Sequence, residues 1–168
     1  MKIAVYGPLY NERSKSTIKT LIVYLKKRKA IVVFEKNFHT SIVKDSDIDL
    51  NSCFSETFDI LDASYNLLIS IGGDGTILRA ITFVKDLKIP MVGINTGRLG
   101  FLATIPMNTI HEAMDEIFEG NYRISKRSLL TIEVDAKNTS LDLDFGLNEI
   151  AVNRKNTTSM ISVETWLD

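Results

Sequence analysis

The segment 67–84 constrains the fold more than any other part of the chain. Residues 67–71 form a short apolar run, Leu-Leu-Ile-Ser-Ile, which predicts a buried strand, and the glycine-rich stretch 72–75 follows it directly. Apolar residues then recur at helical spacing, at Ile77, Leu78, Ile81 and Val84. The sequence therefore predicts a strand, a tight glycine turn and a helix in succession.

Strand and helix patterns also alternate elsewhere in the first 120 residues. Short apolar runs predict strands at 2–7, 30–35 and 90–95. Two more helices are predicted: one with Ile18, Leu21, Ile22 and Leu25, capped by Ser14 or Ser16 and ending in a solvated basic run at 26–29, and one from about Pro106 to Gly120. The polar segment 36–56 is expected to be a surface excursion. This alternation favours an open, mainly parallel α/β sheet.

The pattern changes after Tyr122. The apolar residues Leu130, Ile132 and Val134 alternate with polar ones, and Ile161, Val163, Thr165 and Leu167 alternate with polar or exposed partners. A period of two without helices predicts the start of an antiparallel β domain. We therefore expect an α/β phosphate-binding domain over residues 1–122 and the beginning of a β domain over 123–168.

Composition limits the class of protein. The 168 residues carry a formal net charge of -1 without a basic block, which argues against nucleic acid as the main partner. No stretch approaches about 18 apolar residues and the N-terminus does not resemble a signal peptide, so we expect a cytoplasmic protein without a membrane partner. A single cysteine, Cys53, excludes an internal disulfide, and His39 and His111 are expected to be structural.

The glycine turn is the first candidate site. Gly72, Gly73 and Gly75 let the backbone approach a ligand or take positive φ, and the start of the following helix attracts phosphate. Asp74 beside a phosphate is favourable only if it holds a cation or accepts a proton from the attacking group. The alternative is a tight turn in which Asp74 merely caps the helix. Neither a Walker signature nor a G-x-G-x-x-G motif is present.

Two later stretches carry further candidates. Arg98 lies in a second glycine-bearing loop, where it either binds phosphate or is an ordinary surface residue. Phe101 and Leu102 follow and are expected in the core. Asn148 and Glu149 suit a nucleoside, but in a regular strand they would face opposite sides, so joint contact needs a bulge or a strand end.

In this order and spacing, the motifs GGDGT, NTGRLGFLA and LNEIAV resemble the NAD kinase family, from about residue 67 to about residue 153. GGDGT alone is shared with diacylglycerol and sphingosine kinases and resembles a turn of phosphofructokinases, whereas the combination is specific. The resemblance implies an α/β domain followed by a β-sandwich domain, with NAD bound between them. It also implies transfer of a phosphoryl group from ATP or polyphosphate, with a divalent metal such as Mg²⁺, to the 2′-hydroxyl of the adenosine ribose, giving NADP.

The resemblance assigns roles residue by residue. Asp74 would be the catalytic base that acts on the 2′-hydroxyl. The candidate NAD-binding residues are Asp74, Gly75, Phe101, Asn148 and Glu149. The candidate phosphate- and donor-binding residues are Gly72, Gly73, Thr76, Arg79 and Arg98. No residue is assigned as a metal ligand.

Family members continue beyond the Asn-Glu motif, whereas this chain ends at Asp168. We therefore expect an incomplete second domain, homo-oligomers formed through its unpaired strand edges or poorly ordered strands, and negligible activity of the chain alone. Two alternatives stay open: a lipid or sugar kinase that shares the glycine turn, and a folded nucleotide-binding module without turnover. A thermal-shift screen of NAD, diacylglycerol, sphingosine and fructose 6-phosphate separates the kinases.

Overall fold

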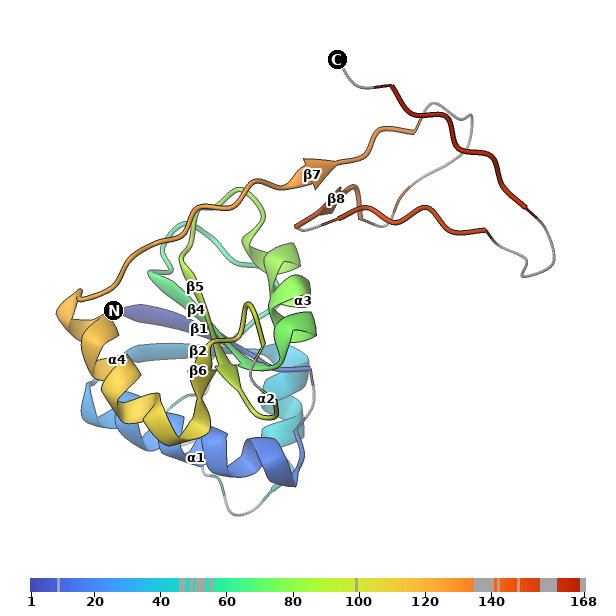
Figure 1. The fold of residues 1–168 in the computed structure, drawn as a ribbon. Helices are drawn as coiled ribbons and strands as arrows, with labels where there is room; N and C mark the ends of the chain where they lie inside the picture. The colour runs from blue at the N-terminus through green and yellow to red at the C-terminus, as the bar shows by residue number, and fades with distance from the viewer. Residues whose placement is uncertain are drawn as a thin grey trace. The chain divides into compact units, whose positions relative to one another are not determined.

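Six strands form a parallel sheet in the first part of the chain (Figure 1). Their order is β3-β2-β1-β4-β5-β6, and each neighbouring pair is parallel. The strands are β1 (Lys2–Tyr6), β2 (Ile31–Glu35), β3 (Thr57–Phe58), β4 (Leu67–Gly72), β5 (Met91–Asn95) and β6 (Ile105–Pro106). The predicted open, mainly parallel α/β sheet is confirmed.

This computed structural model describes residues 1–8, 10–45, 48, 50, 54, 56–98, 100–134, 141, 143–147, 149–154 and 160–166. The chain divides into two compact units, Met1–Ile124 and Ser125–Asp168. No helix in the described ranges combines the length and the apolar character that crossing a membrane requires.

The two faces of the sheet carry different helices, because alternate residues of a strand point to opposite sides. Ile3 and Val5 of β1 pack in one core cluster with α1, α2 and α4, whereas Ala4 and Tyr6 pack in a second cluster with α3. The helices are α1 (Glu12–Lys27), α2 (Lys36–Val43), α3 (Asp74–Val84) and α4 (Ile110–Glu119), with a short 3₁₀ turn, η1 (Met107–Thr109), before α4. Figure 1 shows α1 and α4 together on one side of the sheet and α3 on the other.

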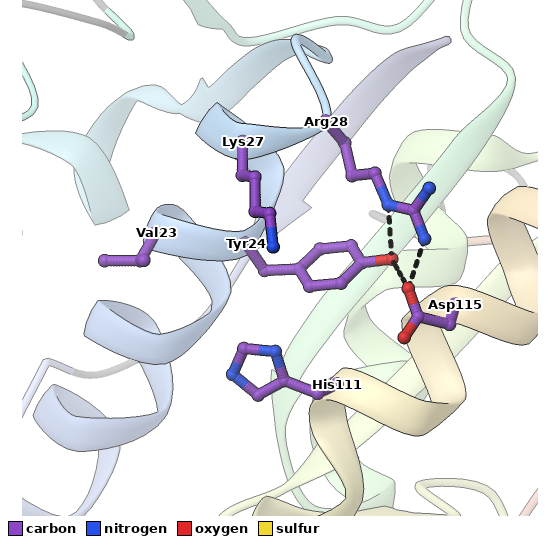
Figure 2. Close-up of a pocket in the computed structure, with 6 residues that line it drawn as sticks. All are labelled: Val23, Tyr24, Lys27, Arg28, His111 and Asp115. Carbon is purple, nitrogen blue, oxygen red and sulfur yellow. Dashed lines mark hydrogen bonds and ion pairs between the residues drawn. The ribbon is translucent and has the colours of Figure 1, made fainter.

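A polar cluster joins the C-terminal end of α1 to α4 (Figure 2). The Tyr24 hydroxyl donates to Asp115 Oδ1 over 2.6 Å, and Arg28 Nε donates to the Tyr24 hydroxyl over 2.9 Å. Arg28 also forms an ion pair with the Asp115 carboxylate, and its guanidinium lies 5.4 and 5.5 Å from the ring centres of Tyr24 and Phe118. The basic run 26–29 is therefore not only a solvated helix end, because Arg28 binds the Asp115 carboxylate of α4 and contacts one ring of α1 and one of α4.

The segment 36–56 is not the surface excursion that its polarity predicted. Its first residues form α2, since the Glu35 side chain accepts hydrogen bonds from the backbone N–H groups of Asn37 and Phe38 and caps the helix. Among the described residues of the segment, five apolar side chains are buried in the core: Phe38, Ile42, Ile48, Leu50 and Phe54.

The predicted start of α1 was also wrong, because Asn11 is the N-cap. Its Oδ1 accepts from Ser14 N over 3.0 Å, and Ser14 Oγ accepts from Asn11 N over 2.9 Å, which forms a capping box. The expected caps, Ser14 and Ser16, therefore lie inside the helix. The end of α4 is as predicted: Gly120 follows the helix with φ 80°, a left-handed conformation that glycine adopts without strain.

The second unit contains a two-stranded antiparallel sheet. β7 (Leu130–Thr131) pairs with β8 (Phe145–Gly146), and Ile132 N donates to Asp144 O over 2.7 Å. Antiparallel pairing was predicted here. The predicted strand at 161–167 is not formed over the described residues 160–166, because a strand needs a hydrogen-bonded neighbour and these residues pair with no described segment. Leu167 lies outside the described residues.

Candidate functional site

β1 and β4 lie side by side in the sheet, and the chain leaves them toward opposite faces. After β1 it continues into α1, and after β4 it continues into α3 on the other face. In doubly wound sheets, ligands bind at this switch point, outside the carboxyl ends of the strands. The glycine turn 72–75 follows β4 and therefore lies at the position where such a fold binds its ligand.

Gly72 shapes this turn, whereas Gly73 and Gly75 leave space around it. Gly72 has φ +155°, and a Cβ on it would lie 2.1 Å from Thr76 Oγ1. A Cβ on Gly73 or Gly75 would meet no atom within 4 Å among the residues that the structure describes. Gly73 is the N-cap of α3, and as a glycine it gives the helix no side-chain cap hydrogen bond. The start of α3 is therefore accessible to an anion, which its backbone N–H groups attract. The side chain of Thr76, a predicted donor-site residue, is buried against Gly72.

The Asp74 carboxylate accepts three backbone hydrogen bonds from the loop that follows β5. Ala103 N and Leu102 N each donate to Oδ1 over 2.9 Å, and Phe101 N donates to Oδ2 over 2.8 Å. These bonds favour the charged form, so the pKa of Asp74 lies below its ordinary value and the carboxylate is ionised at neutral pH. Asp74 does not cap α3, which was the alternative interpretation of the turn. Gly100 is required beside it, since a Cβ there would lie 2.1 Å from Oδ1.

Asn95, the last residue of β5, holds the same loop through its side chain. Its Oδ1 accepts from Gly97 N over 2.7 Å, and its Nδ2 donates to Arg98 O over 2.6 Å and to Ala103 O over 3.4 Å. Only 4% of Asn95 is exposed. Asn95 was not among the predicted site residues. The available signal was an amide at the last position of a buried strand, where a buried polar side chain requires hydrogen-bond partners.

Phe101 is 94% exposed, and Leu102 is half-buried. The prediction that both lie in the core was wrong for Phe101. Its backbone N–H is held by Asp74 in an irregular loop, and no regular strand or helix directs its ring inward. An exposed aromatic ring on a fixed backbone offers a flat apolar surface to a ligand.

Two predicted cationic side chains, those of Arg79 and Arg98, are exposed on the elements that flank the turn. Arg79 lies on α3 and interacts with the hydroxyl of Tyr6 at the end of β1, where burial raises the pKa of Tyr6. Arg98 lies in the loop after β5, and its backbone carbonyl is bound by Asn95. Their chemistry suits phosphate, and their roles as donor contacts stay predictions.

Two further predicted residues, Asn148 and Glu149, belong to the second unit. Asn148 lies outside the described residues, and Glu149 is exposed in the second unit, so the predicted contact of both with NAD stays a prediction. His39 Nε2 lies 3.2 Å from the carbonyl oxygen of Phe54, and the ring of His111 packs edge-on against Tyr24. Cys53 also lies outside the described residues.

Within the described ranges, no group of three or more histidine, cysteine, aspartate or glutamate residues could hold a metal ion. A Mg²⁺ site does not require such a group, since Mg²⁺ keeps several water ligands beside one or two carboxylates.

A hollow of about 460 Å³ lies between α1 and α4 and contains none of the predicted site residues (Figure 2). It is lined by Val23, Tyr24, Lys27, Arg28, His111 and Asp115. The Arg28 charge is neutralised by Asp115 in its wall.

The strand order and the turn at the switch point define a doubly wound α/β protein of the class that binds nucleotides at the carboxyl ends of its strands. Residues 10–122 match the ATP-NAD kinase N-terminal domain, and the chain belongs to the NAD kinase family. It is 44% identical over its whole length to an NAD kinase of Christiangramia forsetii and 37% identical to one of Bacteroides fragilis.

The fold is also similar to the crystal structure of yeast NADH kinase in complex with NADH. The TM-score is 0.66 at 16% sequence identity, and the match covers 87% of this chain and 46% of the yeast chain. The chain spans 58% of the Christiangramia relative and 57% of the Bacteroides relative.

Proposed function

We propose that this chain supplies the phosphate-binding part of an enzyme that phosphorylates the 2′-hydroxyl of the adenosine ribose of NAD. The observation that carries the proposal is an ionised carboxylate, Asp74, held beside the open N-terminus of α3 at the switch point of the sheet. The substrates are those that the family suggests: the curated relatives are called NAD kinase, and the similar yeast structure contains NADH. The donor is ATP or polyphosphate.

Asp74 can accept a hydrogen bond from the ribose hydroxyl while it keeps its three hydrogen bonds to the loop. A carboxylate has about four acceptor positions, and the loop N–H groups occupy three of them, two on Oδ1 and one on Oδ2. The remaining position on Oδ2 accepts a hydrogen bond from the 2′-hydroxyl and fixes the direction of its attack.

The proton moves late in this reaction, because a carboxylate with a lowered pKa is a weak base. The 2′-oxygen forms a bond to the terminal phosphorus of ATP while the bond from that phosphorus to the bridging oxygen breaks and ADP leaves. Asp74 takes the hydroxyl proton as the new bond makes the hydroxyl acidic, and passes it to solvent. Positioning and charge stabilisation supply most of the rate in such transfers.

The other candidate residues divide between the two substrates. The open backbone at Gly73 and Gly75, the start of α3 and the side chains of Arg79 and Arg98 suit the phosphates. The exposed ring of Phe101 suits a nucleotide ring, and the family resemblance adds Asn148 and Glu149 as nucleoside contacts. A divalent metal, Mg²⁺, would arrive with the donor as part of that substrate. A homo-oligomeric state and a cytoplasmic location are further proposals, which rest on the sequence alone.

The test is an assay with radiolabelled ATP and NAD, on this chain and on a version extended at its C-terminus with the remaining segment of the Christiangramia relative. We expect NADP from the extended protein and about 10²-fold or greater loss of turnover in its Asp74→Asn variant. Transfer of label to diacylglycerol, sphingosine or fructose 6-phosphate in place of NAD would contradict the proposal. Binding of NAD and ATP by this chain without turnover would identify it as a nucleotide-binding module.

A further inference from the structure

The loop between β5 and β6 is held from two sides by two side chains that lie on different elements. Asp74, at the start of α3, binds the backbone N–H groups of residues 101–103. Asn95, at the end of β5, binds Gly97 N and the carbonyl oxygens of Arg98 and Ala103. Ala103 is the shared residue: its N–H goes to Asp74 and its carbonyl to Asn95.

The packing beneath the loop leaves it little freedom. A Cβ on Gly93, in the buried interior of β5, would lie 2.7 Å from the Cα of Ala103, so the loop backbone lies directly on the strand. A Cβ on Gly100 would lie 2.1 Å from Asp74 Oδ1, so the carboxylate also approaches the loop backbone closely. Such contacts fix the backbone while the ring of Phe101 remains in solvent.

We propose that Asn95 is a positioning residue of the nucleotide site, which holds loop residues 96–98 and 100–103 in the shape that delivers three N–H groups to Asp74 and presents Phe101. The inference rests on the proposed function for the identity of the ligand. Asparagine is suited to the task because a single carboxamide both donates and accepts. Loss of the carboxamide leaves two carbonyl groups and one N–H group of the loop without their partner, at a buried position where unmet hydrogen bonds are costly.

Native-state hydrogen exchange of the ¹⁵N-labelled chain tests the loop itself, with no nucleotide present. In Asn95→Ala we expect the amides of Phe101, Leu102 and Ala103 to exchange about tenfold faster or more, relative to the amides of β4, because local opening becomes easier. The matched control is Ser70→Ala, which removes another buried side-chain hydrogen bond, from Ser70 Oγ to Val92 O, outside the loop. In the Ser70→Ala variant, the exchange rates of the loop amides and of the β4 amides should change by the same factor.

The inference would be overturned if, in Asn95→Ala, the exchange rates of the loop amides rose no more than those of the β4 amides. A direct measurement on the unaltered chain covers the case in which the variant does not fold. The 2.6 Å hydrogen bond from Asn95 Nδ2 to Arg98 O should give a scalar coupling across the bond, and its absence would equally overturn the inference.

Titration calorimetry with NAD separates this inference from the proposed function. If the unaltered chain binds NAD, we expect Asn95→Ala to weaken binding by about tenfold, in the same direction as Phe101→Ala. A loosened loop with unchanged NAD affinity would refute the positioning role and leave the proposed function standing. A loop that loosens in the Asn95 variant, while the C-terminally extended protein binds no NAD, would refute NAD as the ligand and leave the structural role of Asn95 intact.

Discussion

Gly75→Ala, in the glycine turn, should have opposite effects on protein stability and on nucleotide affinity. Gly75 is the second residue of α3, its φ is not in the left-handed region, and a Cβ on it would meet nothing within 4 Å among the described residues. Alanine therefore fits the folded backbone and restricts the unfolded chain, which raises the free energy of unfolding by about 0.4–1 kcal/mol. The added methyl group would stand where the proposed function places a phosphate, so we expect NAD or ATP affinity to fall by about tenfold, which is about 1.4 kcal/mol.

Urea denaturation followed by far-UV circular dichroism and calorimetric titration with each nucleotide measure the two effects. Gly72→Ala is the matched control: its Cβ would lie 2.1 Å from Thr76 Oγ1, so we expect a loss of about 1–3 kcal/mol in stability. A more stable Gly75→Ala variant that binds both nucleotides as tightly as the unaltered chain would refute the assignment of the turn to phosphate binding.

Three further predictions concern other parts of the first unit. Gly93→Ala should cost about 1–3 kcal/mol of stability in urea denaturation, because its Cβ would lie 2.7 Å from the Ala103 backbone. Gly97→Ala, whose Cβ would meet only Asn95 Oδ1, at 3.9 Å, among the described residues, should change the stability little. Leu50→Ala, at a site 1% exposed, should cost about 2–5 kcal/mol in the same assay, a loss that a surface segment would not show. In a spectrophotometric titration, Tyr10 should ionise with a pKa of about 12, because burial and the hydrogen bond to Asp45 oppose the phenolate, and Tyr10→Phe should remove this step. The folded state holds this proton more tightly than the unfolded chain, whose tyrosine pKa is about 10. The resulting contribution of Tyr10 to the free energy of unfolding is present below about pH 10 and is lost as pH rises through about 12.

The order of strands and helices could be predicted because each relies on a pattern that is local in the sequence. The run at 67–71 lies in the middle of a parallel sheet and is buried on both sides, so its residues are nearly all apolar. The helix that follows buries one side, so its apolar residues recur every three or four positions. Gly120 ends α4 for a reason that is equally local, since its left-handed φ suits glycine.

The parts that could not be predicted depend on contacts between distant residues. Leu50 and Phe54 lie among polar neighbours without a regular period, and only the packed fold shows that both are buried. The three partners of Asp74 are backbone N–H groups 27 to 29 residues away. Backbone donors are common to nearly all residue types, so the sequence does not indicate which of them bind Asp74. The glycine turn could thus be recognised from sequence, whereas the ionised, three-fold bonded state of its carboxylate could not.

The central place of β1 has a consequence for how the site comes into being during synthesis. β1 pairs with both β2 and β4, and Lys2 N donates to Asn66 Oδ1, 64 residues further along the chain. Contacts of such wide sequence separation slow folding, because a long loop must close before they form. A nascent chain that has not yet emerged to Ala103 also lacks the N–H groups that bind Asp74. On the ribosome, the glycine turn should therefore remain without its bound carboxylate until the strand and loop that follow α3 have left the exit tunnel.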